Sequence, residues 1–219
     1  MAEDMRSMRS TAGIAEFERG YEVPDCVVLD STYSSMGRMV AVRACAAAGW
    51  AYHDSVTLLE LVPECGVAIE DVERLDARLA KGSADLAAVR VSDEFARIWE
   101  AYVLGARRAL DAGPCLIHDR LSRAAIEGLG HRCVAVLSCA FDARAMRVRT
   151  RFSPKYAGLA TDAELDAAAA AEDDVRRSWH ALVDGATVWA EPAAYDLVLN
   201  TDHLGRDFAA KLLALLMQG

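Results

Sequence analysis

The chain has 219 residues, of which 53% are hydrophobic and 26% are charged, and these proportions indicate one globular domain with a sizeable core. The net charge of −9 argues against general nucleic-acid binding, because that function needs a basic surface. No apolar run reaches the roughly 20 residues that cross a bilayer, and residues 1–20 lack the apolar core of a signal peptide, so we expect a cytoplasmic protein with no membrane partner.

The cysteines and histidines do not indicate a metal centre. The six cysteines include no C-x-x-C pair, and most of them lie in or beside apolar runs, which is typical of buried reduced thiols. The five histidines are scattered without the spacing of zinc ligands. We therefore expect no structural metal ion.

The N-terminal half alternates short apolar runs with amphipathic segments. Residues 1–24 are interpreted as a peripheral lead-in and residues 25–219 as the domain. In chain order we expect a strand at Cys26–Leu29, a helix at Gly37–Ala48, a strand at Trp50–His53, and helices at Ser55–Val62 and Ile69–Lys81. Ser92 is expected to cap a long helix that ends at Gly113-Pro114. Five large apolar residues share its inner face: Phe95, Ile98, Trp99, Tyr102 and Val103.

The C-terminal half continues the alternation. The expected elements are a strand at Cys115–Ile117, a helix at Ser122–Glu127, a strand at Cys133–Leu137, a helix at Asp142–Thr150, a helix from Thr161 to about Val183, a strand at Tyr195–Leu199 and a helix at Gly205–Met217. The longest of these helices opens on a capping box, Thr161 to Glu164. Strands that alternate with helices favour a mainly parallel sheet covered on both faces.

Ligands of such sheets bind beyond the carboxyl ends of the strands. This rule places Ser31–Arg38, His53–Ser55 and His118–Arg120 around one cleft. The first segment contains a loop of small and polar residues that leads into a helix. The N–H groups of such a loop and of the helix N-terminus can bind an anion, so we interpret the loop as a phosphate cradle.

The loop matches the P-loop pattern G-x-x-x-x-G-K-[ST] only in part. Thr32 stands at the first glycine position and Gly37 at the second, while Arg38 replaces the lysine and Met39 the hydroxyl residue. Arginine still offers charge and a fork of donors to phosphate, but a thioether is a poor ligand for Mg²⁺. The alternative is an ordinary strand-to-helix turn with a solvated Arg38.

Basic residues gather in one stretch of this acidic chain. The group consists of Arg144, Arg147, Arg149, Arg151 and Lys155, and a second pair follows at Arg176 and Arg177. Both groups flank the loop at residues 153–160, in a helix-loop-helix arrangement suited to a lid over a phosphate. The alternative is a solvated helix face that pairs with acidic residues elsewhere.

Several segments resemble the cytidylate kinase-like family of bacterial P-loop proteins, over about residues 25–218. The segment Trp189–Thr201 is similar to the family's Trp-Gly-Asp-Pro, Tyr-Asp-Leu and Asn-Thr signature, and Trp50–Asp54 and Asp174–Arg177 are similar to its Tyr-Tyr-Asp and Asp-x-Arg-Arg segments. The family loop Gly-Ser-Gly-Gly-Arg corresponds here to residues 34–38, with glycines lost at Ser34 and Met36. A Cβ at these positions is expected to restrict positive φ and to crowd a phosphate.

The resemblance implies a three-layer αβα P-loop NTPase fold with a mainly parallel sheet, an acceptor-side helical region at about 55–90 and a helical lid at about 144–180. It also implies transfer of the γ-phosphoryl group of ATP, with Mg²⁺, to a nucleoside monophosphate or similar small acceptor. The implied donor-binding residues are Ser34, Ser35, Met36, Gly37, Arg38 and Met39. The implied catalytic residues are Arg38, Arg144, Arg147 and Arg177. The implied acceptor-binding residues are Asp54, Asp119 and Arg120, although Asp119 stands where the family has glycine and would repel a phosphate.

Two other functions stay open at this point. The altered loop favours, as one alternative, a catalytically degenerate protein that binds a nucleotide or another phosphorylated ligand and acts as a sensor or interaction partner. The other is an interaction protein that keeps only the fold. The apolar face around Trp99 and Tyr102 is expected to belong to the core, but it could instead form a homodimer interface.

Overall fold

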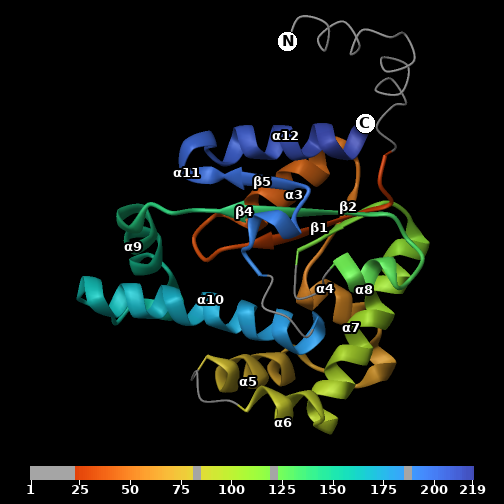
Figure 1. The fold of residues 1–219 in the computed structure, drawn as a ribbon, viewed down its shortest axis with the longest axis horizontal. Coiled ribbons are helices and arrows are strands. Elements are labelled where there is room, and N and C mark those ends of the chain that lie inside the picture. Colours follow the sequence, from red (N-terminus) through yellow and green to blue (C-terminus); the bar gives the residue numbers. More distant parts are fainter. Residues whose placement is uncertain (1–22, 81–84, 119–122, 185–188) are drawn as a thin grey trace, which may run out of the picture.

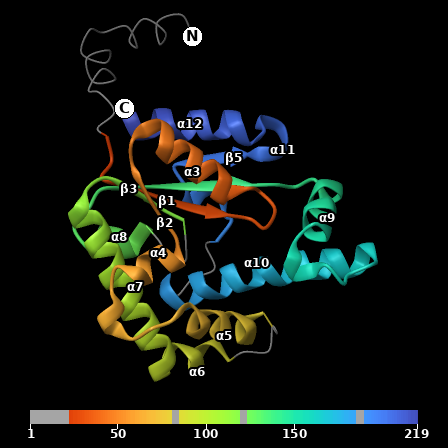
Figure 2. The same cartoon turned by 180° about the vertical axis from the view of Figure 1, so that it is seen from behind.

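The computed structural model describes residues 23–80, 85–118, 123–184 and 189–219. These residues form one five-stranded sheet of order β2-β3-β1-β4-β5, in which every neighbouring pair is parallel. The strands are β1 (Cys26–Ser31), β2 (Ala51–His53), β3 (Cys115–Ile117), β4 (Cys133–Cys139) and β5 (Leu197–Asn200). Helices cover both faces of the sheet (Figures 1 and 2), so the expected three-layer αβα fold with a parallel sheet and a helical lid is confirmed.

One face of the sheet is covered by helices that follow the first and last strands. These are α3 (Gly37–Ala48), α11 (Thr201–Leu204) and α12 (Arg206–Gln218). Their core includes Val40 and Leu213, packed against Leu29 of the central strand. Burial on both faces explains why β1 is a continuous apolar run rather than an alternating one.

The other face carries the larger core. It is covered by α4 (Ser55–Glu60), α5 (Ile69–Leu79), α7 (Asp93–Ala112), α8 (Arg123–Glu127) and α10 (Asp162–Asp184), with the short η1 (Pro63–Cys65) and α6 (Leu86–Arg90) beside them. Phe95, Ile98 and Tyr102 of α7 are buried there together with Trp179 of α10. This part of the apolar face of α7 therefore packs in the core.

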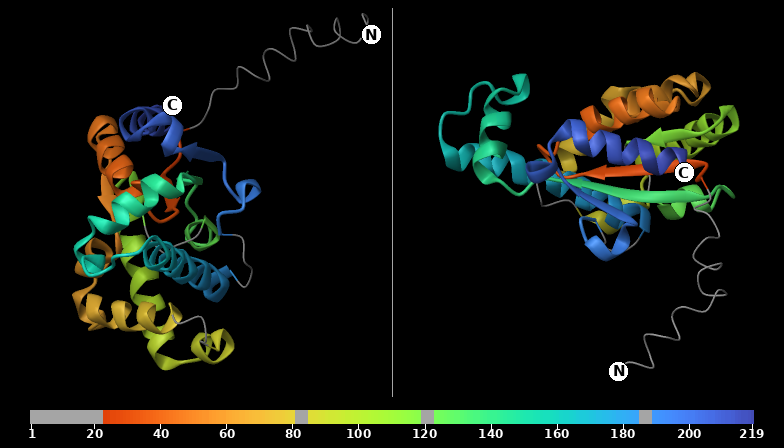
Figure 3. Two further views of the ribbon diagram at one scale, coloured as in Figure 1. Left: turned by 90° about the vertical axis from the view of Figure 1, so that its left-hand side faces the viewer. Right: turned by 90° about the horizontal axis from the view of Figure 1, so that it is seen from above.

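The lid projects from the carboxyl end of the sheet (Figure 3). It consists of α9 (Ala143–Arg151), η2 (Pro154–Tyr156) and the first half of α10, and a further short turn, η3 (Pro192–Ala194), precedes β5. The side chain of Asp142 caps α9, and Thr161 and Glu164 form the expected capping box at the start of α10. No helix in the described ranges is both long and apolar enough to cross a membrane.

Several expected boundaries were wrong for identifiable reasons. Trp50 does not begin β2, because its N–H bonds the carbonyl of Cys45 and closes α3 instead. Tyr195 does not begin β5, because its N–H bonds the carbonyl of Pro192 and closes η3 instead. β1 and β4 continue past their expected ends because Ser31 and Ser138 still pair with each other. The short helices α6 and α11 were not expected.

Candidate phosphate loop and adjoining cavity

The loop between β1 and α3 keeps a glycine-like backbone although two of its residues carry side chains. Ser34 has a φ of 68° and Met36 a φ of 59°. A left-handed conformation costs a residue with a Cβ roughly 1–2 kcal/mol. The Cβ atoms at these positions therefore cost energy. The expected restriction does not prevent positive φ at Ser34 and Met36.

The loop ends at the N-terminus of α3, which has no side-chain cap. Met36 occupies the N-cap position without a side-chain hydrogen bond. The first N–H groups of a helix have no intrahelical acceptor and carry the positive end of the helix dipole. Gly37 follows in a tight place, because a Cβ built on it would lie 2.5 Å from Ser31 Cβ and 3.1 Å from His118 Nε2.

Three other predicted donor positions differ in their surroundings. Ser35 is fully buried, and its backbone carbonyl accepts a hydrogen bond from Ser138 Oγ at 3.3 Å, which ties the loop to β4. Arg38 has a side chain that is 74% exposed and lies 3.4 Å from Asp54 Oδ2. Met39 is 41% exposed. The predicted donor residue Arg38 and the predicted acceptor residue Asp54 thus lie side by side at the first turn of α3.

The lid contacts the loop through two residues that were not among the predicted catalytic set. Arg149 of α9 donates a hydrogen bond from Nη1 to the carbonyl of Ser34, and its side chain is only 29% exposed. Asp173 of α10 accepts a hydrogen bond from the N–H of Tyr33 at 2.6 Å. Burial raises the pKa of the Asp173 carboxyl, while Tyr33 and Arg176 partly offset this effect.

The predicted catalytic arginines of the lid lie elsewhere. Arg147 bonds Asp166 at 2.7 Å and Asp162 at 3.0 Å, within the lid itself. Arg177 pairs with Asp174 and lies 5.4 Å from the ring centre of Trp189. Arg144 is exposed near the start of α9. We expected several guanidinium groups to lie over the loop. Arg149 contacts the loop, whereas Arg147 and Arg177 pair with nearby carboxylates.

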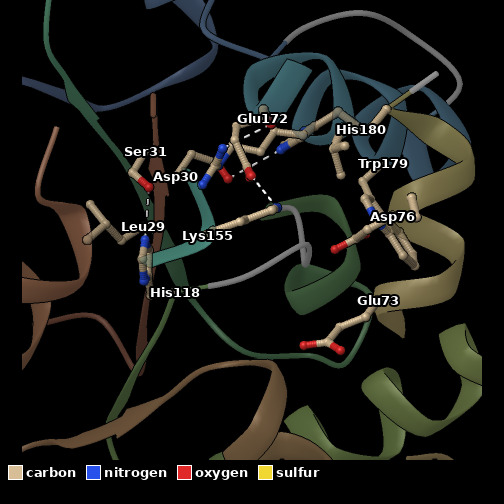
Figure 4. Close-up of a pocket in the computed structure, with 14 residues that line it drawn as sticks. Leu29, Asp30, Ser31, Glu73, Asp76, His118, Lys155, Glu172, Trp179 and His180 are labelled. Carbon is tan, nitrogen blue, oxygen red and sulfur yellow. Dashed lines mark hydrogen bonds and ion pairs between the residues drawn. The ribbon is translucent and has the colours of Figure 1, made fainter. Parts of the chain in front are cut away.

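A cavity of about 480 Å³ opens beside the loop, between the end of β1, α5 and α10 (Figure 4). Its polar lining comes from Asp30, Ser31, Glu73, Asp76, His118, Lys155, Glu172, Arg176 and His180. Its apolar lining includes Leu29, Val175 and Trp179. The predicted acceptor residues Asp119 and Arg120 lie outside the described residues. The volume is in the range of small-molecule sites.

A chain of hydrogen bonds runs from the cavity to the loop. Ser31 Oγ and His118 Nε2 are 2.9 Å apart, and His118 Nδ1 lies 3.3 Å from the hydroxyl of Tyr52. Tyr52 donates in turn to Asp54 Oδ2 at 3.4 Å. Ser31 and His118 line the cavity and also meet Gly37. They therefore stand between the cavity and the uncapped end of α3.

A buried polar network supports the other side of the cavity. His180 lies 3.2 Å from Asp30 Oδ1 and 3.3 Å from Asp184 Oδ2, and the hydroxyl of Tyr195 donates to Asp30 Oδ2 at 2.7 Å. Burial disfavours the charged imidazole, but the bonds and charges of Asp184 and Asp30 outweigh it and raise the pKa of His180 to about 9. Sequence analysis did not single out His180, although its i, i+4 spacing to Asp184 was visible.

The raised pKa of His180 predicts a pH-dependent stability. The ordinary pKa is 6.5, so the charged imidazole contributes fully below pH 6.5 and this contribution is lost as the pH rises through about 9. The loss is of the order of 3 kcal/mol. Urea unfolding between pH 6.5 and 9 should show this decline in the wild type. The decline in the free energy of unfolding with pH should be absent in His180→Asn and present in the control variant His131→Asn. The same decline in His180→Asn as in the wild type would contradict this prediction.

The expected Mg²⁺ has no protein-built site among the described residues. No group of three or more His, Cys, Asp or Glu side chains there could hold a metal ion. Met39 offers only a thioether where a hydroxyl ligand is usual. With the described residues alone, Mg²⁺ would be held mainly by the phosphates of the donor.

The loop, the uncapped helix and the cavity lie at the carboxyl edge of a parallel sheet, which is where α/β proteins commonly bind small ligands. Neither a family model nor a curated protein matches the sequence. An uncharacterized protein from Eubacterium ventriosum ATCC 27560 is similar in structure, with a TM-score of 0.59, 12% identity, and coverage of 89% of this chain and 99% of that chain. This likeness shows a shared fold.

Weaker structural likenesses are to named kinases. A sugar kinase from Janibacter sp. HTCC2649 aligns with a TM-score of 0.46 and 13% identity over 88% of this chain and 94% of that one. Shikimate kinase from Bacteroides thetaiotaomicron aligns with a TM-score of 0.47 and 12% identity, over 89% of this chain and 96% of that one.

Proposed function

We propose that this chain is a P-loop kinase-like phosphotransferase that takes its donor at the loop of residues 32–39 and its acceptor in the adjoining cavity. One observation carries the proposal. The left-handed backbone at Ser34 and Met36 leads into an uncapped helix N-terminus, and the Ser31–His118 pair joins that point to the cavity. A donor phosphate and an acceptor hydroxyl could therefore meet beside Gly37.

The donor side would use backbone N–H groups more than side chains. ATP, when bound, supplies the transferable γ-phosphoryl group. The N–H groups at the start of α3 would bind its phosphates, and Arg38 would add charge from the exposed edge of the loop. Arg149, already placed on the Ser34 carbonyl, would neutralise charge that develops during transfer.

The acceptor side is consistent with a small polar molecule. The cavity lies beside the loop. Asp54 does not line it, but connects to it through Tyr52 and His118, and is held in place as the cap of α4 by the N–H of Thr57 at 3.2 Å. The resemblance to cytidylate kinase-like proteins points to a nucleoside monophosphate acceptor. In that version of the proposal the residues that face the acceptor are Asp54, Asp119 and Arg120. The lid rearranges, and the transferring phosphoryl group is then contacted by Arg144, Arg147 and Arg177.

A second candidate is a degenerate protein that binds a phosphorylated ligand without turnover. Two observations favour it. Asp173 already places a carboxylate on the N–H of Tyr33, where it competes with an incoming anion. Met39 removes the hydroxyl that would help to hold Mg²⁺. Binding without phosphoryl transfer would separate this candidate from the kinase.

Two measurements test the proposal. The first is calorimetric titration with ATP and Mg²⁺. The second is a coupled ADP-release assay with CMP, dCMP, UMP, AMP and simple alcohols as acceptors. We expect ATP to bind, and Arg38→Ala to weaken binding about tenfold or more because a charge-assisted contact is lost. Arg43→Ala is the matched control, since Arg43 lies on α3 but pairs with Asp207. ATP binding with background ADP release for every acceptor favours the degenerate protein, and no binding of ATP rejects both candidates.

A further inference from the structure

The guanidinium of Arg149 faces acceptors from two distant parts of the chain. Its Nη1 donates to the carbonyl of Ser34 in the loop and lies 3.9 Å from Oδ1 of Asp202. Asp202 belongs to the first turn of α11, which follows β5. Figures 1 and 2 show α11 and α9 at the same end of the sheet. The lid arginine that reaches the loop is therefore faced by a carboxylate from outside the lid.

The same carboxylate holds the start of the lid. Its Oδ2 accepts hydrogen bonds from the N–H groups of Phe141 and Asp142, the second at 2.8 Å. These residues come directly before α9, and the Phe141 side chain is 74% exposed, so this segment is attached through its backbone rather than by burial of the ring. Asp202 thus contacts the chain before the first turn of α9 and faces Arg149 in its last turn.

The sheet fixes the position of Asp202. Its own N–H donates to Asn200 Oδ1 at 3.1 Å, and the hydroxyl of the adjacent Thr201 donates to the carbonyl of Cys139 at 3.0 Å. The Asp202 side chain is only 12% exposed. Because Asn200 ends β5 and Cys139 ends β4, the carboxylate is anchored to these two strands and not to the lid.

One oxygen of this carboxylate has an incomplete set of contacts. Asp202 Oδ1 is buried and accepts no hydrogen bond from the described part of the chain, where Arg149 is the cation paired with it. A buried carboxylate oxygen without a donor costs free energy, so it attracts a nearby cationic donor. Arg149 has further N–H groups besides the one on Ser34. The guanidinium is therefore held between the Ser34 carbonyl and the Asp202 carboxylate.

We propose that Asp202 is a positioning residue, which fixes the start of the lid to the sheet and holds the Arg149 guanidinium over the loop. This inference rests on the proposed function, in which Arg149 neutralises charge during transfer. Asp202 acts through Arg149 and touches neither donor nor acceptor. A long side chain that is already held in place loses less rotamer freedom when the transferring group arrives, and such pre-organisation raises the rate.

The variant Asp202→Asn separates the two contacts. Its amide oxygen can still accept from the N–H groups of Phe141 and Asp142, but the negative charge beside Arg149 is removed. We expect kcat for ADP release to fall about tenfold with little change in the KM for ATP, and Asp202→Ala, which removes both contacts, to lower kcat about 10²-fold. Asp207→Asn is the matched control, since Asp207 pairs with Arg43, and it should change kcat less than about twofold.

A double-mutant cycle distinguishes positioning from general support of the fold. In the Arg149→Ala background, Asp202→Asn should lower kcat by less than about a further twofold, because the group that Asp202 positions is gone. Losses that add in the double variant would show that Asp202 acts without Arg149, and they would overturn the inference. An unchanged kcat in Asp202→Asn alone would overturn it as well.

A spectroscopic measurement tests the contact without turnover. The NMR signal of the Arg149 Nε–H group, assigned by its absence from Arg149→Ala, should shift in Asp202→Asn and stay in place in Asp207→Asn. Hydrogen exchange of the Phe141 and Asp142 amides should speed up about tenfold or more in Asp202→Ala and change little in Asp202→Asn. An unshifted Arg149 signal in Asp202→Asn would contradict the proposed contact.

Failure of this inference can be told apart from failure of the proposed function. If ATP binds and an acceptor is phosphorylated, but the losses from Asp202→Asn and Arg149→Ala add, the kinase proposal stands and the positioning role is wrong. If no acceptor is phosphorylated, the kinase proposal is wrong and the Arg149 signal decides the rest. A shift in Asp202→Asn then supports the hold of Asp202 on the guanidinium, and no shift rejects it.

Discussion

If the proposed phosphoryl transfer takes place, replacement of Arg149 by alanine should lower its rate about 10³-fold, as the loss of an arginine that stabilises a transferring phosphoryl group does in GTPases. Arg149 is the lid arginine that reaches the loop, through its bond to the Ser34 carbonyl. Its guanidinium is partly shielded from water, so its charge acts at a lower effective dielectric than that of an exposed arginine. Steady-state ADP release, with an acceptor that is active in the coupled assay, measures the effect.

Two further variants distinguish charge neutralisation from a structural role for Arg149. Arg151→Ala removes the same side chain on the same helix from an exposed position, where it lies 3.7 Å from Asp162, and should change kcat less than about threefold. Arg149→Lys keeps the charge without the fork and should recover part of kcat. Equal activity of Arg149→Ala and Arg151→Ala would show that Arg149 does not act in transfer.

Replacement of Gly37 by alanine should destabilise the fold and weaken donor binding together. The added Cβ would lie 2.5 Å from Ser31 Cβ, so the first turn of α3 or the end of β1 has to shift. Overpacking of this kind costs typically about 1–3 kcal/mol. Urea unfolding, followed by tryptophan fluorescence, measures the stability, and titration with ATP measures the binding.

Gly158 provides the control for that substitution. It lies in the lid, and a Cβ built on it would meet nothing within 4 Å. Gly158→Ala should therefore leave the free energy of unfolding within about 0.5 kcal/mol of the wild type. If Gly37→Ala is as stable as Gly158→Ala and binds ATP normally, then the tight packing of Gly37 against Ser31 and His118 is not needed for the loop.

Most elements could be predicted because their signals are local. The apolar run from Cys26, the left-handed Gly49 and the hydroxyl of Ser92 each fix a boundary through backbone chemistry within a few residues. Two boundary errors came from backbone bonds that composition does not reveal. Trp50 and Tyr195 have the composition of strand residues, yet their N–H groups bond the carbonyls of Cys45 and Pro192, a few residues earlier.

The location of the loop could be predicted, but the roles of the lid arginines could not. Arg147 and Arg149 are two residues apart and carry the same charge, so composition does not distinguish them. The fold separates them, because α10 brings Asp162 and Asp166 to Arg147 while the end of β4 brings Arg149 over Ser34. The Asp30–His180 pair likewise exists only after β1 and α10 pack together.

The strand order has a consequence for how the protein is made. β1 carries the loop and leaves the ribosome early, yet its neighbours in the sheet begin at Cys115 and Cys133. During synthesis β1 therefore waits, apolar and unpaired, until most of the polypeptide has been translated, and such distant pairings form slowly. The strand that leads into the candidate phosphate loop is thus also open to misassociation in the nascent chain.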